Sequence, residues 1–287
     1  MEGQFLTILM PLKNYHLQYL QRSIESVITQ SYSQWKLLVI VEKGDFHHFG
    51  KTLKKELNDS RIEIITNQGR KLAGAINSGM RYARTEFVAL LLADDMWSVD
   101  AAEILNDYMV RYPQVDFFHS SRVVINEHGK FVSPVYYSKE QFDIDEFKWR
   151  SPVKHLLCWR KEKALSIGGL DESLNSVGPD DYDFPWMMAE KGAIFKAVKE
   201  CLYYYRNHCE SYRLTTHIPL SVHKREIKRI LKKHGVGIFS RMLIVAKKRK
   251  IGAFGEQCLY RSAVDRWIKE KFRGDARRNW RQKYTGA

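Results

Sequence analysis

Two groups of acidic residues have the types and spacing that a catalytic site needs. Asp94-Asp95 directly follows the apolar run Phe87–Leu92, and Asp180–Asp183 contains three acids in four residues. Adjacent carboxylates at the end of a buried strand repel one another unless a cation lies between them. A hard divalent cation that holds a diphosphate uses such oxygen ligands and keeps other positions open for phosphate oxygens. Helix capping is the alternative explanation for both groups, because carboxylates also accept hydrogen bonds from free helix amides.

The second acidic group and one histidine suggest two further roles. Three acids exceed what a helix cap requires, so one of them is a candidate general base for an acceptor hydroxyl. His208, at the end of Tyr205–His208, is a candidate metal ligand or phosphate contact. A lone histidine is more often structural, and spacing alone leaves both interpretations of His208 open.

Apolar runs that are typical of buried strands alternate with amphipathic stretches through the first hundred residues. The expected strands are 5–10, 35–41, 62–65 and 87–92. The expected helices are 17–28, a stretch around Leu53, and 72–83. Strands that are apolar on both faces predict a mainly parallel sheet covered by helices on both sides, and ligands bind beyond the carboxyl ends of such strands. The residues at those ends are Pro11, Glu42, Asn67 and Asp94.

The second half of the chain has a more mixed pattern. It predicts a strand at 115–120, a hairpin over 123–132, an acidic and aromatic loop at 136–149, and helices at 161–166 and 183–191.

The net charge of +14 is confined to the last quarter of the chain. Residues 218–287 hold 20 of the 47 Lys and Arg residues but only 5 of the 33 acidic ones, so the rest is nearly neutral. This distribution argues against a nucleic-acid enzyme with a basic active cleft. Hydrophobic residues make up 44% of the chain, enough for a large core, which excludes wholesale disorder.

Neither the cysteines nor the apolar runs indicate secretion. The four cysteines form no Cys-x-x-Cys pair, and free thiols in a reducing compartment are expected. The beginning of the sequence lacks the features of a signal peptide. The longest apolar run, Phe87–Ala93, falls far below the ~18 residues that span a bilayer. We therefore expect a cytoplasmic protein.

The order of these motifs resembles that of the inverting family 2 glycosyltransferases over about the first three quarters of the chain. The opening motif is Pro11-Leu12-Lys13-Asn14, followed by Ser26-Val27-Ile28-Thr29-Gln30-Ser31-Tyr32. The central motifs are Val41–Gly44, Asn67–Gly69, Ala73–Gly79 and Leu92–Asp95. The closing motifs are Gly168–Leu174, Asp180–Asp183, Glu190–Gly192 and Tyr204–His208 followed by Ser211. Each motif is weak alone, but their common order is a strong signal.

The resemblance implies a GT-A fold and assigns roles to residues. Asp181 would deprotonate the acceptor hydroxyl in a single displacement with inversion, and Glu42 would recognise the nucleotide base. The metal, Mn²⁺ or Mg²⁺, would be held by Asp94, Asp95 and His208. The nucleotide-sugar site would comprise Pro11, Leu12, Asn14, Glu42, Asn67, Lys71, Ala93 and Asp94.

Three positions depart from the family pattern. Leu92 replaces the first acid of the metal motif, Lys43 replaces an acid near the nucleotide, and Asp180 stands for the usual Glu. The first departure puts strong metal dependence in doubt, although Asp95 is placed to compensate. The Gln-x-x-Arg-Trp motif of processive members is missing, which favours transfer of a single sugar.

The resemblance divides the chain into a GT-A domain, 1–217, and a basic helical tail, 218–287. Amphipathic stretches at 221–234 and 259–272 carry apolar residues on one side and Lys and Arg around them. Such helices suit the anionic inner face of a membrane, where the protein would be peripheral. They equally suit packing of the apolar stripe on the catalytic domain. Both readings of the tail stay open, and nucleic-acid binding is disfavoured.

The expected function is transfer of one sugar from a nucleotide sugar, with a UDP-sugar as the expected donor. The acceptor would be a hydroxyl of a glycan or of a lipid-linked sugar in cell-surface polysaccharide assembly. Two alternatives remain: a catalytically degenerate GT-A protein that binds glycans or acts as a scaffold, which Leu92 favours, and a nucleotidyltransferase. The sequence gives no indication of the oligomeric state.

Overall fold

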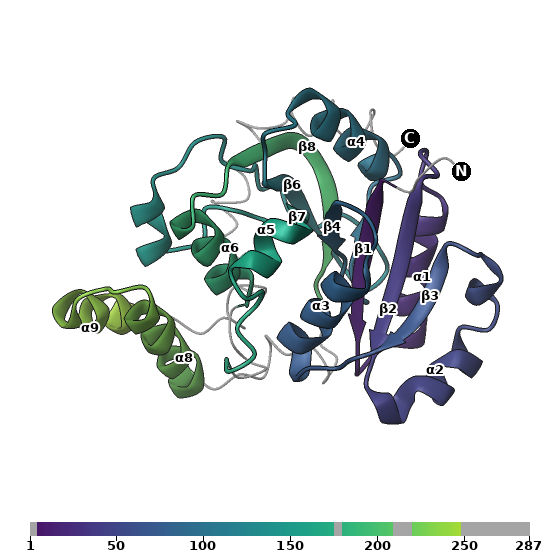
Figure 1. Ribbon diagram of the computed structural model, residues 1–287, viewed down its shortest axis with the longest axis horizontal. Helices are drawn as coiled ribbons and strands as arrows, with labels where there is room; N and C mark the ends of the chain where they lie inside the picture. Colours follow the sequence, from purple (N-terminus) through teal and green to yellow (C-terminus); the bar gives the residue numbers. More distant parts are fainter. Residues whose placement is uncertain (1–4, 175–179, 209–219, 248–287) are drawn as a thin grey trace.

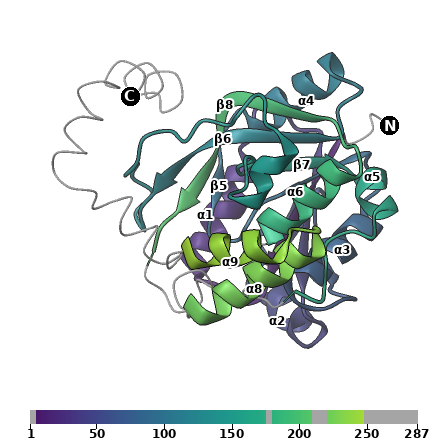
Figure 2. The same ribbon diagram turned by 90° about the vertical axis from the view of Figure 1, so that its left-hand side faces the viewer.

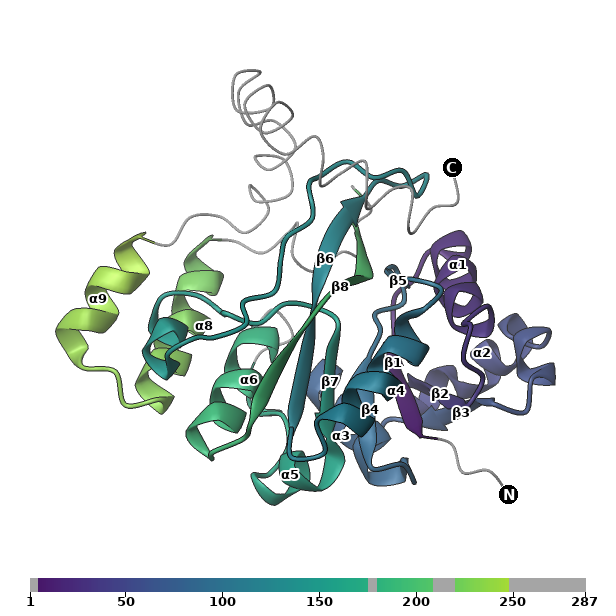
Figure 3. The ribbon, with the colours of Figure 1, turned by 90° about the horizontal axis from the view of Figure 1, so that it is seen from above.

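A computed structural model describes residues 5–174, 180–208 and 220–247. Within these residues the chain forms one mixed sheet in the strand order β3-β2-β1-β4-β7-β6-β8-β5, with helices on both faces (Figure 1). The strands β1 to β4 run parallel to one another, and β7 runs antiparallel to both β4 and β6. β8 runs parallel to β6 along most of its length (Figure 3).

The elements of the first half alternate between strand and helix. They are β1 (Leu6–Leu12), α1 (Leu17–Ile28), β2 (Trp35–Val41), α2 (Phe46–Thr52), β3 (Ile62–Thr66), α3 (Lys71–Tyr82) and β4 (Phe87–Leu90). The second half contains β5 (Met96–Trp97), α4 (Ala101–Arg111), β6 (Phe117–Ile125), β7 (Leu157–Arg160), α5 (Lys161–Ser166), α6 (Asp180–Glu190), β8 (Phe195–Arg206), α8 (Leu220–Lys233) and α9 (Ile238–Lys247). A 3-10 turn, η3 (Ile144–Lys148), lies in the long connection before β7.

The sheet separates two apolar layers, because successive strand side chains point to opposite faces. One layer packs α1, α2 and α4 against alternate residues of β1 and β2, with Leu20, Phe49 and Leu105 contributed by the helices. The other packs α3, α5, α6 and α8 on the opposite face, with Ile76 and Trp186 among its buried side chains. Both faces of the parallel strands are therefore buried, as their continuous apolar sequences predict.

The first half confirms the predicted elements to within a few residues. β1 extends past its predicted end, through Pro11 to Leu12. The amide of Leu91 donates to the carbonyl oxygen of Leu9, so Leu9 faces β4. Pro11, two residues later, faces the same side, but the pairing with β4 has already ended at Leu9. Because no β4 residue lies opposite Pro11, its missing N–H costs the sheet no hydrogen bond.

The second half departs from the prediction in its strands. β6 continues through Ile125, past the expected start of the hairpin. The hairpin itself is confirmed, because Ile125 forms an antiparallel bridge with Phe131 and the amide of Val132 donates to the carbonyl of Val124. The expected loop at 136–149 contains η3. β7 has only four residues, and β8 interrupts its apolar pattern with Lys199-Glu200, so neither has the period that identifies a strand in sequence.

α6 begins three residues earlier than predicted and contains Pro185. A proline at this position has no N–H to donate to the carbonyl of Asp181, four residues before it. The hydroxyl of Ser151 donates to that carbonyl instead, with an oxygen-to-oxygen distance of 3.4 Å. The segment before β7 thus supplies the hydrogen bond to the Asp181 carbonyl that Pro185 cannot donate.

α8, the first helix of the basic tail, packs on α6 (Figure 2) and belongs to the same apolar layer. Its buried apolar residues are Ile227, Ile230 and Leu231. This is the packing alternative that the sequence left open for the tail. The second amphipathic stretch, 259–272, lies outside the described residues. No helix among the described residues has the length and apolar character to cross a membrane.

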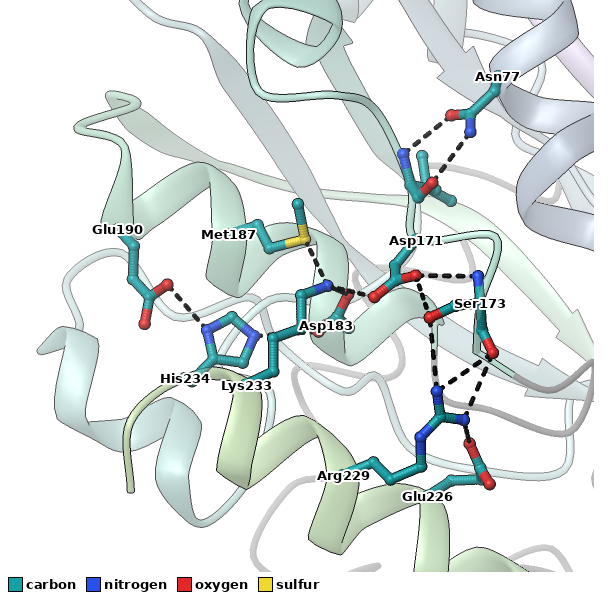
Figure 4. Close-up of polar contacts among 11 residues, drawn as sticks. Asn77, Asp171, Ser173, Asp183, Met187, Glu190, Glu226, Arg229, Lys233 and His234 are labelled. Atoms are coloured by element: carbon teal, nitrogen blue, oxygen red, sulfur yellow. Dashed lines mark hydrogen bonds and ion pairs between the residues drawn. The ribbon is translucent and has the colours of Figure 1, made fainter. Parts of the chain in front are cut away.

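A polar network joins the end of α8 to α6 around the buried carboxylate of Asp183 (Figure 4), whose side chain is 1% exposed. Asp183 accepts from the Lys233 ammonium at 2.8 Å and faces His234 Nε2 at 3.0 Å. The His234 ring stacks on Trp186 with centroids 4.0 Å apart, and its Nδ1 lies 2.9 Å from a carboxylate oxygen of Glu190. These contacts fix the orientation of α6 from its C-terminal half.

Lys233 also binds Asp171, in the loop that precedes α6, at 2.8 Å. Burial alone would raise the pKa of Asp171, but hydrogen bonds from Lys233 and Ser173 outweigh it and lower this pKa to about 2. A carboxyl whose pKa is lower in the folded state stabilises the fold above its unfolded-state pKa, and this contribution is lost as the pH falls through the folded value. Asp171 therefore stabilises the protein at neutral pH.

We expect Lys233→Met to lower the free energy of unfolding by about 1–3 kcal/mol at pH 7, because it leaves the buried Asp183 carboxylate with one partner fewer. Chemical denaturation followed by circular dichroism measures the change. Lys232→Met is the matched control, since Lys232 is exposed. Below about pH 4 the stability difference between parent and Lys233→Met should shrink as the carboxylates take up protons. Equal stability of the two variants at pH 7 would contradict this role of Lys233.

Candidate functional site

The segment Leu92–Trp97, which carries two of the three predicted metal ligands, is held in place by polar side chains of α1 and of the residues just beyond its end. The Ser23 hydroxyl donates to the carbonyl of Leu92, and the amide of Trp97 donates to the Ser26 hydroxyl. Gln30, 8% exposed, donates to the carbonyls of Ser26 and Ser98 and accepts from the amide of Ala102. The Ser26-x-x-x-Gln30 spacing at the end of α1 therefore positions the acidic motif.

Asp95 lies inside the protein, with 1% of its surface exposed. One carboxylate oxygen accepts from the Tyr203 hydroxyl at 2.6 Å, and the other accepts from the backbone amide of Arg206 at 2.7 Å. Burial, and then the charge and hydrogen bond of Asp95, raise the pKa of Tyr203 well above its ordinary value, so the phenol stays a donor. Both oxygens of Asp95 are thus engaged in joining the end of β4 to β8.

Asp94 and His208 form a polar pair beside Asp95. His208 Nε2 lies 3.0 Å from a carboxylate oxygen of Asp94; the histidine side chain is 1% exposed and the aspartate side chain 33%. The Arg206 guanidinium donates to the backbone carbonyl of Asp94 and lies over the ring of Tyr19, which also contacts His208. The structure therefore brings together these two predicted residues, which are 114 positions apart.

The donor set of this pair fits a divalent metal that is shared with a ligand. A carboxylate oxygen and an imidazole nitrogen are both ligands that Mn²⁺ accepts, and two protein ligands leave positions for phosphate oxygens. Among the described residues, no group of three His, Cys, Asp or Glu side chains is arranged to hold a metal by itself. The partly exposed Asp94 could bind a cation from the solvent side without breaking the contacts of Asp95.

A second group of predicted residues meets at the ends of β2 and β3. The Asn67 amide nitrogen donates to a carboxylate oxygen of Glu42 at 3.2 Å and to the carbonyl of Lys71 at 3.2 Å. Its oxygen accepts from the amide of Gly69 at 2.8 Å. Glu42, Asn67 and Lys71 therefore converge, as expected for one nucleotide subsite. Lys71 adopts a φ of 60°, which is uncommon for a residue other than glycine.

The remaining predicted donor-site residues lie at the same edge of the sheet. Leu12 is paired with Val41 at the ends of β1 and β2, directly after Pro11. Asn14 is exposed just beyond β1, and Ala93 is partly exposed next to Asp94.

Asp181 lies in the first turn of α6, and its side chain is 54% exposed. His155 Nε2 lies 3.6 Å from a carboxylate oxygen of Asp181, and the His155 side chain is 7% exposed. Desolvation alone would raise the pKa of Asp181, but His155 and Arg122 outweigh it and lower this pKa below its ordinary value. Asp181 is therefore an ionised carboxylate near neutral pH, able to accept a proton.

His155 connects Asp181 to the acidic motif. Its ring lies 5.2 Å from the ring of Tyr203, whose hydroxyl binds Asp95. Sequence analysis identified neither His155 nor Tyr203, because each lies outside the family motifs and forms these contacts only in the folded chain. Tyr203 directly precedes Tyr204–His208, so its position was a signal that could have been used. His155 has no signal of its own in the sequence.

The site residues Asp180 and Ser211 cannot be placed in the same way. The side chain of Asp180 and the whole of Ser211 lie outside the described residues.

Comparison with known proteins relates the chain to one enzyme family. The sequence profile of the family described as "Glycosyl transferase family 2" matches residues 7–163, more than half of the chain. A stretch of 139 residues is 34% identical to an Escherichia coli protein named "UDP-Glc:alpha-D-GlcNAc-diphosphoundecaprenol beta-1,3-glucosyltransferase WfgD". That stretch covers 47% of this chain and 53% of WfgD, about half of each protein.

A second relative and a solved structure extend the comparison. Over 211 residues the chain is 26% identical to "O-antigen biosynthesis glycosyltransferase WbnJ" of Escherichia coli, which covers 72% of this chain and 81% of WbnJ. The crystal structure of S. aureus TarS 1–349 in complex with UDP-GlcNAc is similar with a TM-score of 0.61 at 14% identity, over 89% of this chain and 70% of that one. This likeness shows the fold, which is GT-A as expected. The chain belongs to glycosyltransferase family 2.

Proposed function

We propose that this glycosyltransferase moves one sugar from a UDP-sugar to a hydroxyl of a lipid-linked sugar acceptor, with inversion at the anomeric carbon. The observation that carries the proposal is the chain of contacts that leads from Asp181 through His155 and Tyr203 to Asp95, the neighbour of Asp94 in the Asp94–His208 pair. An acceptor hydroxyl at Asp181 and a diphosphate at Asp94 would then lie on opposite sides of one sugar carbon. WfgD, which is named for a UDP-glucose donor and a diphosphoundecaprenol-linked acceptor, supports both substrate classes.

Asp181 is proposed as the general base. Its lowered pKa keeps it ionised at neutral pH, and its partly exposed carboxylate is accessible to an acceptor. A carboxylate of this kind is a weak base, so it accepts the hydroxyl proton as the bond to the sugar forms in the transition state. His155 orients the carboxylate from its buried side.

The nucleotide is proposed to bind along the ends of β1, β2 and β3. Glu42 and Asn67 present a hydrogen-bonding edge suited to a base, because their side chains are already held to one another. Pro11, Leu12 and Asn14 line the adjacent strand end, and Lys71 lies at the start of α3. The nucleotide would therefore cross the edge of the sheet towards Ala93 and Asp94.

Asp94 and His208 are proposed to hold a divalent metal, Mn²⁺ or Mg²⁺, together with diphosphate oxygens. When bound, such an ion neutralises charge that develops on the leaving nucleoside diphosphate. Asp95 is proposed to position Asp94 rather than to bind the ion itself, because both of its oxygens already accept hydrogen bonds. This arrangement accommodates Leu92, since the acid missing at that position is not needed for the Asp94–His208 pair.

We expect Asp181→Asn to reduce release of UDP from the preferred UDP-sugar by about 100- to 10,000-fold, the usual range for loss of a general base. UDP affinity should stay within twofold, because Asp181 does not face the nucleotide subsite. A coupled assay for UDP release and calorimetry with UDP measure the two quantities. Asp107→Asn, on the exposed side of α4, makes the same charge change away from the site. Loss of UDP affinity with unchanged turnover in Asp181→Asn would refute the assignment.

The roles of the adjacent acids are separated by comparing Asp94→Asn with Asp95→Asn. Asp94→Asn should remove the Mn²⁺-dependent part of UDP affinity with little change in the free energy of unfolding. Asp95→Asn should lower the free energy of unfolding by about 1–3 kcal/mol, because one oxygen that accepts from Tyr203 or Arg206 becomes a donor. Calorimetry with and without Mn²⁺ and chemical denaturation provide the data. If both variants lost Mn²⁺ dependence and kept their stability, Asp95 would be a ligand.

A further inference from the structure

Three cationic side chains form a cluster near Asp181: Arg122 and Lys154 interact electrostatically with its carboxylate, and Arg150 interacts with Lys154. Arg122 lies on β6 opposite Tyr203, and its guanidinium is 5.2 Å from the ring centroid of Tyr205. Arg150 and Lys154 belong to the segment before β7 that wraps over the first turn of α6. Two contacts fix that segment beside Asp181: the Ser151 hydroxyl to the Asp181 carbonyl, at 3.4 Å, and His155 to the carboxylate, at 3.6 Å.

These cations have no anionic partners of their own. Within the described ranges, no hydrogen bond or ion pair involves the Lys154 ammonium or the guanidinium groups of Arg122 and Arg150, and Arg122 Nε is buried. The charge of Arg150 acts on Glu146, but that carboxylate is already bound by Lys139. The three cations therefore lack an ion pair of the kind that Lys139 makes.

The electrostatics of Lys154 are unfavourable without a further anion. Burial, followed by the charges of Arg122 and Arg150, lowers the pKa of Lys154, and Asp181 is the carboxylate that acts in the opposite direction. Burial and the charge of Lys154 also lower the pKa of His119 to about 3, so this neighbour is neutral and contributes no negative charge. One carboxylate thus faces three cations, and a half-buried ammonium without a partner is costly.

We propose that Lys154 and Arg122, with Arg150 at the rim, bind the diphosphate of the lipid-linked acceptor beside Asp181. This inference rests on the proposed function and specifies its acceptor. Arginine and lysine side chains bind phosphate oxygens through charge-assisted hydrogen bonds, and the N-terminus of α6 adds a favourable dipole. A diphosphate on the acceptor sugar lies about one pyranose ring away from that sugar's hydroxyls, so its binding here would place a hydroxyl at Asp181.

The donor diphosphate is a less suitable occupant of this cluster. The donor is expected at Asp94 and His208, a pair that binds phosphate through a cation, whereas the cluster supplies its own positive charge. Lys154 and Arg150 lie in the segment that contacts the first turn of α6, next to the base that must meet the acceptor. Two diphosphates bound in these two places would flank the sugar that is transferred.

The test measures binding of geranyl diphosphate, a soluble prenyl diphosphate without a sugar, by calorimetry with the full chain in saturating UDP and Mg²⁺. The parent should bind it, and geraniol, which carries no charge, should bind at least tenfold more weakly. Lys154→Met and Arg122→Met should each weaken geranyl diphosphate binding about tenfold, the usual effect of losing one charge-assisted hydrogen bond. UDP affinity should remain within twofold.

The control is Lys191→Met, which removes an exposed charge from the far end of α6 and should leave geranyl diphosphate affinity unchanged. Without ligand, Lys154→Met should melt no earlier than the parent, because it relieves repulsion; a marked loss of stability would mean that Lys154 has a structural partner, and would contradict the proposal. Absence of geranyl diphosphate binding by the parent, or an equal loss of UDP affinity in Lys154→Met, would overturn it. A parent that binds geranyl diphosphate through Lys154 but neither binds UDP nor turns over UDP-sugars would refute the proposed function alone.

Discussion

The buried carboxylate of Asp95 is the interaction on which the arrangement of the site depends. A carboxylate without solvent is stable only when its oxygens accept strong hydrogen bonds, and Tyr203 and the Arg206 amide provide them. Because Asp95 follows β4 and its donors lie on β8, these two hydrogen bonds connect the segment after β4 to β8 at the candidate site. Arg206 then holds the carbonyl of Asp94, and His208 follows two residues later, facing its carboxylate.

The same interaction connects the proposed donor side of the site to the proposed acceptor side. The ring of Tyr203 contacts His155, and His155 reaches the carboxylate of Asp181 from beneath. The two carboxylates therefore differ in environment. Asp95 is buried and stabilises the structure, whereas Asp181 is exposed enough to contact a substrate. Ser26 of α1 and Gln30, just beyond its end, add a second support for the acidic segment.

The sequence predicts the first half of the fold clearly. Short continuous apolar runs such as 35–41 indicate buried strands, and amphipathic stretches such as 17–28 have the period of a helix. It fails at β8, where Lys199-Glu200 interrupts the apolar pattern. For the site, the motif around Asp94 and His208 predicts a pair that the structure brings together. Glu42 and Asn67 were likewise predicted from the ends of their strands. Contacts made by residues outside any motif, such as His155 with Asp181, depend on a loop conformation that no local period encodes.

The packing of α8 on α6 changes how the basic end of the chain should be regarded. By composition this helix belongs to a charged appendage, yet Lys233 pairs with the buried carboxylate of Asp183, which His234, the next residue, also contacts. α6 is held at one end by Ser151 and at the other by the stack of His234 on Trp186. A displacement of α8 would therefore also move α6, the helix that carries Asp181.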